Sequence, residues 1–154
     1  MSNIIDDWVA DDVLWWTTKY PFLTVKDNSV HTWLKIGSTD YHWLSDIYPG
    51  WVNTFGECMC DELLCALDKY VDDFIIIQVK EKFAEIRVYW YWQDREYTEQ
   101  EQGELKEISN SLNTILHKYA NISYQTCVEC GKPATRYSRG WTLPYCSECF
   151  KSKG

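Results

Sequence analysis

The segment from Phe74 to Trp92, FIIIQVKEKFAEIRVYWYW, is the densest run of strand-forming residues in the chain. Its β-branched and aromatic residues fall into two runs, 74–78 and 86–92, and the charged segment 79–85 between them predicts the bend of an antiparallel hairpin. Two sets of side chains alternate along the second run: Ile86, Val88, Trp90 and Trp92 on one face, and Arg87, Tyr89 and Tyr91 on the other. Because only one face can lie against a core, we expect rings on the other face to be exposed.

A helical pattern precedes the hairpin. The break Tyr48-Pro49-Gly50-Trp51 is followed by Thr54 and Glu57, which fit a capping box at the start of a helix that ends near Lys69. One apolar stripe runs along this helix: Phe55, Met59, Leu63, Leu67 and Tyr70. Its spacing predicts that the helix packs on the core through a single face.

A longer helical pattern follows the hairpin. Thr98 and Glu101 form a second capping box, and the helix is expected to run to about Asn121. Its apolar positions are Leu105, Ile108, Leu112, Ile115, Leu116 and Tyr119. This helix leads almost directly into the cysteine-rich tail, which leaves little room for a linker.

The N-terminal quarter has weaker patterns. Apolar residues at helical spacing predict a first helix from Asn3 to Trp16: Ile4, Ile5, Trp8, Val9, Val13 and Trp16. Residues 22–36 alternate loosely and predict one or two strands, interrupted by the turn-like sequence 27–29. Residues 37–40 are expected to form a loop.

The tail contains the most specific chemical pattern in the chain. Cys127 and Cys130, then Cys146 and Cys149, form a C-x2-C…x15…C-x2-C arrangement, which is typical of a tetrahedral zinc site. Four thiolates leave no coordination position open for water or substrate, so a structural Zn²⁺ is expected. Gly131 suits the tight turn after the first pair, and the second pair is expected to open a short helical turn. Iron in the same sulfur cage, a redox dithiol and disulfides are the alternatives.

These elements predict an α+β fold, in which a small antiparallel sheet packs with about three helices and a C-terminal four-cysteine zinc ribbon or knuckle follows. We expect residues 1–123 to form the body and residues 124–154 to form the zinc-binding module. A length of 154 residues allows one core but not two ordinary domains. Nine Trp and eleven Tyr are too many to bury, and exposed rings favour contact with proteins or nucleobases.

Charge is distributed unevenly along the chain. Residues 1–126 contain 21 acidic and 10 basic side chains, whereas residues 127–154 contain 2 and 5. The acidic body repels nucleic acid at long range, so only the tail could attract a phosphate backbone. Its basic residues are Lys132, Arg136, Arg139, Lys151 and Lys153.

The first twelve residues include four aspartates and no basic residue, and no apolar run has the length of a signal sequence or a membrane span. We therefore expect a cytoplasmic protein that does not bind membranes. In that compartment thiols stay reduced, which favours metal over disulfides in the tail. The remaining cysteines are interpreted as small, half-buried apolar groups in the helix before the hairpin: Cys58, Cys60 and Cys65.

Arrangements typical of enzymes are missing from the sequence. His31, His42 and His117 are far apart, and the grouping of Asp40 and His42 near Ser45 is better interpreted as loop polarity than as a catalytic triad. The chain has no glycine-rich phosphate loop, nucleophile elbow or HExxH helix. We expect a protein without enzymatic activity and without a small-molecule substrate.

Two stretches resemble a known family. The run from Phe74 to Phe83, continued by Arg87-Val88-Tyr89, resembles the QVKEKFGGLRFY-type signature of small phage and prophage accessory proteins, and the tail from Cys127 to Cys146 resembles the zinc knuckles that close them. Ala84 and Glu85 stand where that signature has two glycines. The resemblance implies a phage-type accessory protein with a structural zinc, acting in the cytoplasm of a bacterial host. By association, it also implies inhibition of a bacterial defence system.

Two kinds of partner are compatible with these patterns. In the favoured hypothesis, the hairpin and its rings bind a host or cognate protein. The candidate interaction residues are Lys80, Lys82, Arg87, Tyr89, Trp90, Tyr91, Trp92 and Trp141. In the alternative, the basic zinc segment binds DNA or RNA, with Tyr137 and Trp141 stacking on bases. An immunity protein that neutralises a toxin is a further alternative, since such proteins are also small, acidic and cytoplasmic.

Overall fold

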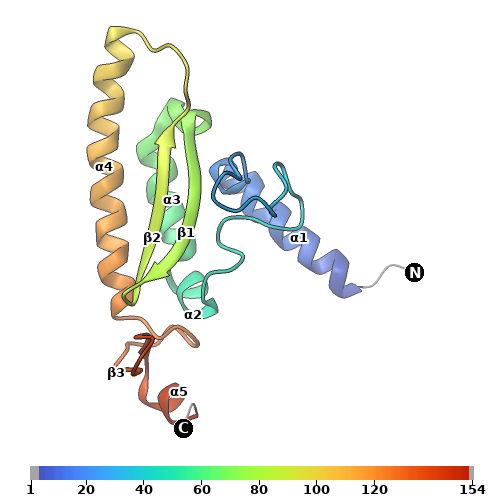
Figure 1. Ribbon diagram of the computed structural model, residues 1–154, viewed down its shortest axis with the longest axis vertical. Helices are drawn as coiled ribbons and strands as arrows, with labels where there is room; N and C mark the ends of the chain where they lie inside the picture. Colours follow the sequence, from blue (N-terminus) through green and yellow to red (C-terminus); the bar gives the residue numbers. More distant parts are fainter. Residues whose placement is uncertain (1–3, 153–154) are drawn as a thin grey trace.

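The computed structural model describes residues 4–152, with side chains from residue 12 onward. It has the predicted α+β architecture, with a small antiparallel hairpin flanked by helices and a cysteine-rich tail (Figure 1). The helices are α1 (Ile4–Lys19), α2 (Pro49–Trp51), α3 (Glu57–Leu67), α4 (Glu99–Tyr124) and α5 (Ser147–Ser152). The strands are β1 (Phe74–Lys82), β2 (Glu85–Trp92), β3 (Arg136–Tyr137) and β4 (Pro144–Tyr145). Among the described residues, no helix is both long and apolar enough to span a membrane.

The hairpin turn is shorter than the sequence suggests. β1 and β2 stay paired as far as Lys82 and Glu85, so the bend expected over residues 79–85 is wrong in length, and Phe83 and Ala84 alone make the turn. Both have positive φ angles, 54° and 67°, as in the two-residue turns that match the twist of a hairpin. The amide of Ala84 donates to the Glu81 carboxylate over 2.8 Å, which helps to hold a conformation that usually needs glycine.

The two faces of the hairpin differ as the alternation predicted. Phe74, Ile76 and Ile86 are buried, and Trp90 and Trp92 pack against the same core. Arg87, Tyr89 and Tyr91 occupy the alternate positions of β2, and both tyrosines are exposed. A register shift between Ile76 and Gln78 marks a β-bulge, and it changes which positions of β1 share the inward face of β2: Phe74 and Ile76 before it, Val79 and Glu81 after it.

The long helix α4 confirms the second capping box. Glu101 donates its amide to the Thr98 hydroxyl, and Thr98 donates its amide to the Glu101 carboxylate. The helix continues to Tyr124, three residues beyond the expected end. It contacts both β2 and α3, and it lies beside β2 in Figure 1. Near its end, the Ser123 hydroxyl accepts the amide of Ile86 over 2.9 Å, which satisfies a polar group on the outer edge of β2.

The first capping box, at Thr54 and Glu57, is wrong. The helical segment begins earlier, at Pro49, and Thr54 lies inside a π-helical turn (Val52–Gly56) that joins α2 to α3. Proline at the first helical position has no amide to leave unpaired, so it starts the helix without a side-chain cap. The predicted stripe is still the buried face: Phe55, Met59, Leu63, Leu67 and Tyr70.

The strands expected in residues 22–36 are also wrong. Pro21–Leu23 forms a 3-10 turn, and no strand occurs between residues 24 and 48, all of which are described. Isolated backbone hydrogen bonds hold the segment instead. Gly37 donates its amide to the Val25 carbonyl, and Trp43 donates its amide to the Leu23 carbonyl. Within residues 22–36 only Phe22, Leu23 and Val25 are buried, and Val30 and Ile36 are exposed, so the loose alternation does not mark a buried face. The loop expected at residues 37–40 is confirmed, with Gly37 at a φ of 73°.

The N-terminal helix is confirmed within the described residues. α1 ends at Lys19, three residues after the predicted end, because Tyr20 still donates its amide to the Trp16 carbonyl. Val13 is buried, and Trp16 stacks on the His42 ring with 5.5 Å between ring centroids. The predicted start at Asn3 and the side chains of residues 4, 5, 8 and 9 lie outside the described set.

The first turn of α2 docks directly on the cysteine-rich tail. Gly50 donates its amide to the Val128 carbonyl over 2.8 Å, and Trp51 donates its indole N–H to the Thr126 carbonyl over 2.9 Å. Trp51 and Val128 are buried in the main hydrophobic cluster. A Cβ atom at Gly50 would lie 2.2 Å from the Cys127 carbonyl oxygen, so the two backbones approach closely only because position 50 is glycine.

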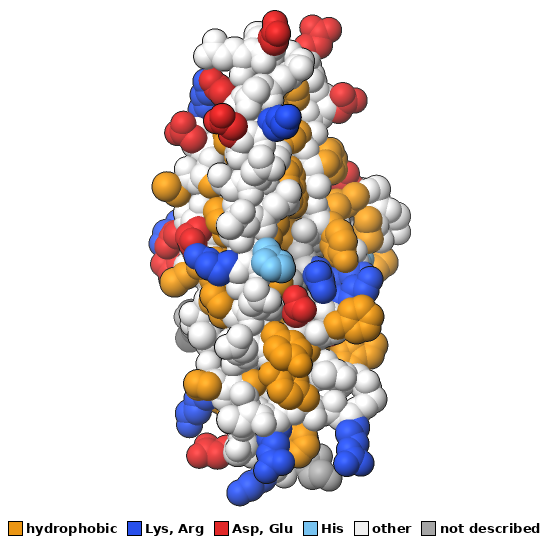
Figure 2. All heavy atoms as spheres, turned by 90° about the vertical axis from the view of Figure 1, so that its left-hand side faces the viewer, with side chains coloured by type: hydrophobic (Ala, Val, Ile, Leu, Met, Phe, Trp, Pro, Cys, Tyr) orange, Lys and Arg blue, Asp and Glu red, His pale blue; other side chains and the backbone are white. Residues whose placement is uncertain are grey.

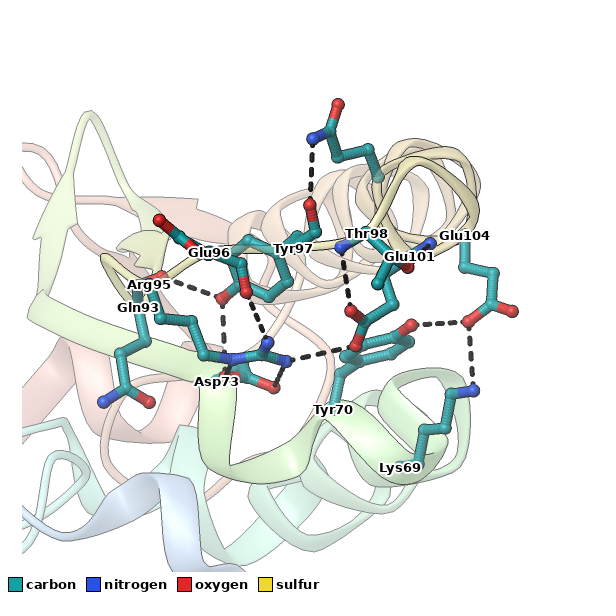
Figure 3. A network of polar contacts seen from close by, with 11 residues as sticks. Lys69, Tyr70, Asp73, Gln93, Arg95, Glu96, Tyr97, Thr98, Glu101 and Glu104 are labelled. Atoms are coloured by element: carbon teal, nitrogen blue, oxygen red, sulfur yellow. Dashed lines mark hydrogen bonds and ion pairs between the residues drawn. The ribbon is translucent and has the colours of Figure 1, made fainter.

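A polar network closes the open end of the hairpin (Figure 3). Arg95 donates to both carboxylate oxygens of Asp73 over 2.6 and 3.0 Å, and Gln93 donates its amide to the Asp73 carbonyl. Arg95 also lies over the Tyr97 ring, 3.9 Å from its centroid. These contacts join the residue before β1 to the segment that leads into α4, so the network fixes the path of the chain from the sheet to the long helix.

Replacing Gly50 with alanine should lower the free energy of unfolding by about 1–3 kcal/mol, because the new methyl group would collide with backbone atoms that cannot rotate away. Urea denaturation measures this change. Gly103→Ala is the matched control, since nothing lies within 4 Å of a Cβ at that helical position, and it should stabilise the protein by about 0.5–1 kcal/mol. Equal stability of the Gly50 variant and the wild type would contradict the docking geometry.

Replacing Asp73 with asparagine should destabilise the protein at neutral pH and have a smaller effect in acid. The hydrogen bonds from Arg95 lower the pKa of the Asp73 carboxyl below its usual 3.8. A carboxylate with a depressed pKa stabilises the fold above its unfolded-state pKa and loses that contribution as the pH falls through its folded-state pKa. Urea titrations should therefore show a difference from wild type that is constant down to about pH 5 and shrinks below about pH 4. Asp72→Asn, at the exposed neighbouring position, is the control, and a difference that does not vary with pH would contradict the assignment.

Candidate metal centre and aromatic surface

The four tail cysteines converge on one point. Their sulfur atoms all lie within 4.8 Å of one another, and those of Cys130 and Cys146 are 3.5 Å apart. A tetrahedral Zn²⁺ with Zn–S bonds of about 2.3 Å would place its sulfurs roughly 3.8 Å apart, so one ion fits among them. All seven cysteines of the chain are free, so no disulfide competes for these sulfurs. The cluster is compatible with a metal site that has four sulfur ligands.

Two different turns present the sulfur pairs, as the sequence predicted. After the first pair, Gly131 has a φ of 81° and donates its amide to the Cys127 carbonyl over 3.1 Å. After the second pair, the chain enters α5, where Phe150 donates its amide to the Cys146 carbonyl. Cys149 also donates its amide towards the Cys146 sulfur over 3.4 Å. The short ladder between β3 and β4 lies between the two turns and brings them together.

The electrostatics of the cluster favour a bound cation. Burial alone would raise the pKa of the Cys127 thiol, but amides of Cys130, Cys146 and Glu129 donate to its sulfur and lower that pKa to about 6. In contrast, the hydrogen bond with Cys146, together with burial, raises the pKa of Cys149. Four sulfurs this close cannot all ionise without a positive charge between them, and a divalent cation supplies that charge.

The remaining candidate groups do not converge. The interpretation of Cys58, Cys60 and Cys65 as half-buried groups is wrong, because Cys60 is buried and the other two are exposed. None of the three belongs to the metal-type cluster found among the described residues. His42 accepts the amide of Leu44 at its Nδ1 atom and donates its own amide to the Ser45 hydroxyl, while Asp40 accepts a hydrogen bond from Ser38. Burial lowers the pKa of His42 to about 4. These bonds are local turn contacts and do not form a relay.

Three large aromatic side chains are the most exposed rings of the described residues. Trp33, Phe83 and Trp141 are 76%, 74% and 71% exposed. Trp33 and Trp141 line one cavity of about 360 Å³, and Phe83 and Trp141 line another of about 460 Å³. Since Trp141 borders both cavities, the three rings and the two hollows form one continuous feature, which we call the aromatic surface.

The structure divides the predicted interaction residues into three groups. Lys80, Lys82 and Trp141 line the cavities of the aromatic surface. Arg87, Tyr89 and Tyr91 lie on the outward face of the hairpin, where Lys80 sits over the Tyr89 ring. Trp90 and Trp92 face the core instead.

Sequence reasoning missed two members of the aromatic surface. The sequence pattern places Phe83 in the bend and gives it no role, although an aromatic residue at the tip of a tight turn cannot be buried by its own hairpin. Trp33 lies in a segment that was predicted as strand, and nothing in its local pattern indicates exposure. Trp141 was predicted, and its indole donates to the Glu81 carboxylate over 2.7 Å, which links the tail to the hairpin.

Charged side chains are unevenly distributed along the face drawn in Figure 2. Figure 2 shows acidic side chains gathered at the end where α4 begins, and basic side chains at the end formed by the tail. Apolar side chains are visible between the two ends of that face. Within the tail, Tyr137 stacks on Tyr124 with 4.8 Å between centroids and donates its hydroxyl to the Tyr124 carbonyl, so this ring is already engaged within the protein.

Comparison with protein families, with curated proteins and with solved structures found no match to this chain. Its function must therefore be argued from the metal centre and the aromatic surface.

Cys127→Ser should abolish stoichiometric metal binding and loosen the tail, because it removes a buried sulfur ligand beside the docked α2 turn. Inductively coupled plasma mass spectrometry of the purified protein measures the bound metal, and limited proteolysis reports on the tail. Cys58→Ser, at an exposed position outside the cluster, is the matched control and should retain one ion per chain. Unchanged metal content in the Cys127 variant would rule out the site.

Proposed function

We propose that the metal is Zn²⁺ and that its role is structural. The donor set is four cysteine sulfurs, which zinc accepts in a closed tetrahedral shell. With Cys127, Cys130, Cys146 and Cys149 all bound, no position is left for water or substrate. The ion would contribute folding energy to a segment whose strands are only two residues long and could not be stable alone.

We further propose that the chain is a protein-binding module without enzymatic activity. The observation that supports this is the aromatic surface, where three large rings remain exposed around two cavities. Tryptophan and other aromatic residues supply much of the binding energy in protein interfaces, where they act as anchors in desolvated pockets. Leaving such rings in water does not stabilise a monomer. Exposed apolar patches of this kind mark sites where a partner protein binds and covers the rings.

The family resemblance and the net charge narrow the proposed partner. Because the chain resembles phage accessory proteins, we propose that the partner is a bacterial host protein and that the chain inhibits a defence system. A chain with a net charge of −8 favours a basic partner or one that handles nucleic acid. The alternative is that the chain is an immunity protein and its partner is a toxin. Such a toxin would also be a basic protein or one that handles nucleic acid.

Nucleic acid is the alternative ligand for the exposed Trp141, and the two hypotheses differ in their response to charge. If DNA or RNA were bound, the interaction would weaken steeply with salt and with Arg136 and Arg139 replaced by glutamate. A protein partner on the aromatic surface would depend on the rings instead. The acidic body and the engaged Tyr137 ring favour the protein partner.

Replacing Phe83 and Trp141 together with alanine should remove a partner from affinity purifications of bacterial lysate, with at least a tenfold loss of binding, because truncating an aromatic anchor typically costs more than about 1–2 kcal/mol. Mass spectrometry of the captured proteins is the measurement. The melting temperature should fall only slightly, since both side chains are exposed and the variant loses a single exposed hydrogen bond, from Trp141 to Glu81. Leu14→Ala, which removes an exposed apolar side chain from α1, is the control. A partner that binds the double variant and the wild type equally would contradict the proposal.

A further inference from the structure

The outer edge of β1 has unpaired backbone groups where it borders the aromatic surface. In an antiparallel ladder, backbone groups point alternately towards the partner strand and away from it. The amide of Ile86 bonds to Ser123 on α4, so it points away from β1. Its partner in the register is Glu81, whose amide and carbonyl must therefore point away from β2, and the same alternation applies to Val79 opposite Val88.

These outward groups have no strand beside them. β2 is flanked by α4, whereas no strand flanks β1 in Figure 1. Among the described residues, no backbone hydrogen bond outside the hairpin involves the amide or carbonyl of Val79 or Glu81. Unpaired edges of this kind are templates for another strand.

The space beside this edge is bounded and suits a short extended segment. The cavity of about 360 Å³ is lined on one side by residues 78–81 and on the other by the loop that includes Trp33, Tyr41 and Asp46. At one end the Gln78 and His31 side chains meet at 3.3 Å, and at the other end Trp141 bonds to Glu81. The exposed edge is therefore short and bounded at both ends. It has room for one peptide strand but not for the addition of further strands.

The charges in the cavity indicate the chemistry of the occupant. Asp46, Lys80 and Glu81 are its charged lining residues, but the Lys80 ammonium lies over the Tyr89 ring on the outward face of the hairpin, 5.5 Å from its centroid. The carboxylates of Asp46 and Glu81 therefore make the local potential negative, in a body that is strongly acidic overall. A basic side chain would be favoured beside them, and an apolar one against Trp33.

We infer that this groove binds an extended, basic peptide segment of the partner protein, which adds a third strand to the hairpin by pairing with Val79 and Glu81. The inference rests on the proposed protein-binding function and specifies its mode. Main-chain hydrogen bonds would supply affinity, and the side chains of alternate peptide residues would meet the aromatic wall and the carboxylates.

The matched variants Val79→Pro and Val79→Ala test strand pairing directly. Proline removes the outward amide but is tolerated on an edge strand, whereas alanine keeps the amide and loses a similar amount of side-chain packing. The probe is a display library of random peptides about ten residues long, the length of a long strand, panned against the zinc-loaded protein. Enriched peptides should be basic, should bind the Val79→Ala variant, and should bind the Val79→Pro variant about tenfold more weakly.

Amide hydrogen exchange measured by NMR gives a second readout that does not depend on the variants. In the free protein, the amides of Val79 and Glu81 should exchange faster than those of Lys80 and Lys82, which point into the ladder. A selected peptide should protect the first pair. The inference is overturned if no peptide is enriched, if peptides bind the proline variant as tightly as the alanine variant, or if the two amides stay unprotected in the complex.

The same variants separate this inference from the proposed function. A lysate partner that is lost with the Phe83 and Trp141 double variant but retained by Val79→Pro would keep the protein-binding proposal and refute strand pairing. Absence of any partner that depends on Phe83 and Trp141 would refute the proposed function itself.

Discussion

The structure depends on one close backbone contact, between the first turn of α2 and the first cysteine turn. Gly50 and Trp51 bond to carbonyls on either side of Cys127, and the missing side chain at position 50 is what lets the two segments meet. The four-cysteine cluster is thereby attached to the main hydrophobic cluster, to which Cys127 and Cys146 belong. A bound ion and the core would stabilise each other, because each fixes the backbone that the other needs.

This contact also determines where the aromatic surface forms. The tail returns from the metal cluster to the hairpin, where Trp141 bonds to Glu81 and closes one end of the groove. The rest of the groove comes from the β1 edge and the irregular segment around Trp33. Three parts of the chain that are far apart in sequence thus build one surface, and none of them could form it alone. Binding at this surface would therefore depend on the integrity of the four-cysteine cluster.

The high aromatic content of the chain has two structural uses, in the core and on the aromatic surface. Rings such as Trp43, Trp51, Phe74 and Tyr20 fill the core, and Trp90 and Trp92 cover its margin. The three most exposed rings, Trp33, Phe83 and Trp141, border the cavities beside the unpaired strand edge, whereas other rings are exposed elsewhere: Trp15, Tyr89, Tyr91 and Tyr124. An aromatic wall beside free main-chain groups offers a partner both buried apolar area and directional hydrogen bonds, which is the combination that strand addition uses.

Local residue patterns were sufficient for the hairpin, for α4 with its capping box, and for the four-cysteine cluster, because each depends on spacing within a short stretch of chain. They failed at residues 22–36 and at Thr54, where burial against distant segments overrode weak alternation and where Pro49 began the helix early. They could not show that Phe83 and Trp33 border the same surface as Trp141, or that the β1 edge is open. Those features arise from how the tail, the loop and the hairpin pack together, and long-range packing leaves no periodic signal in the sequence.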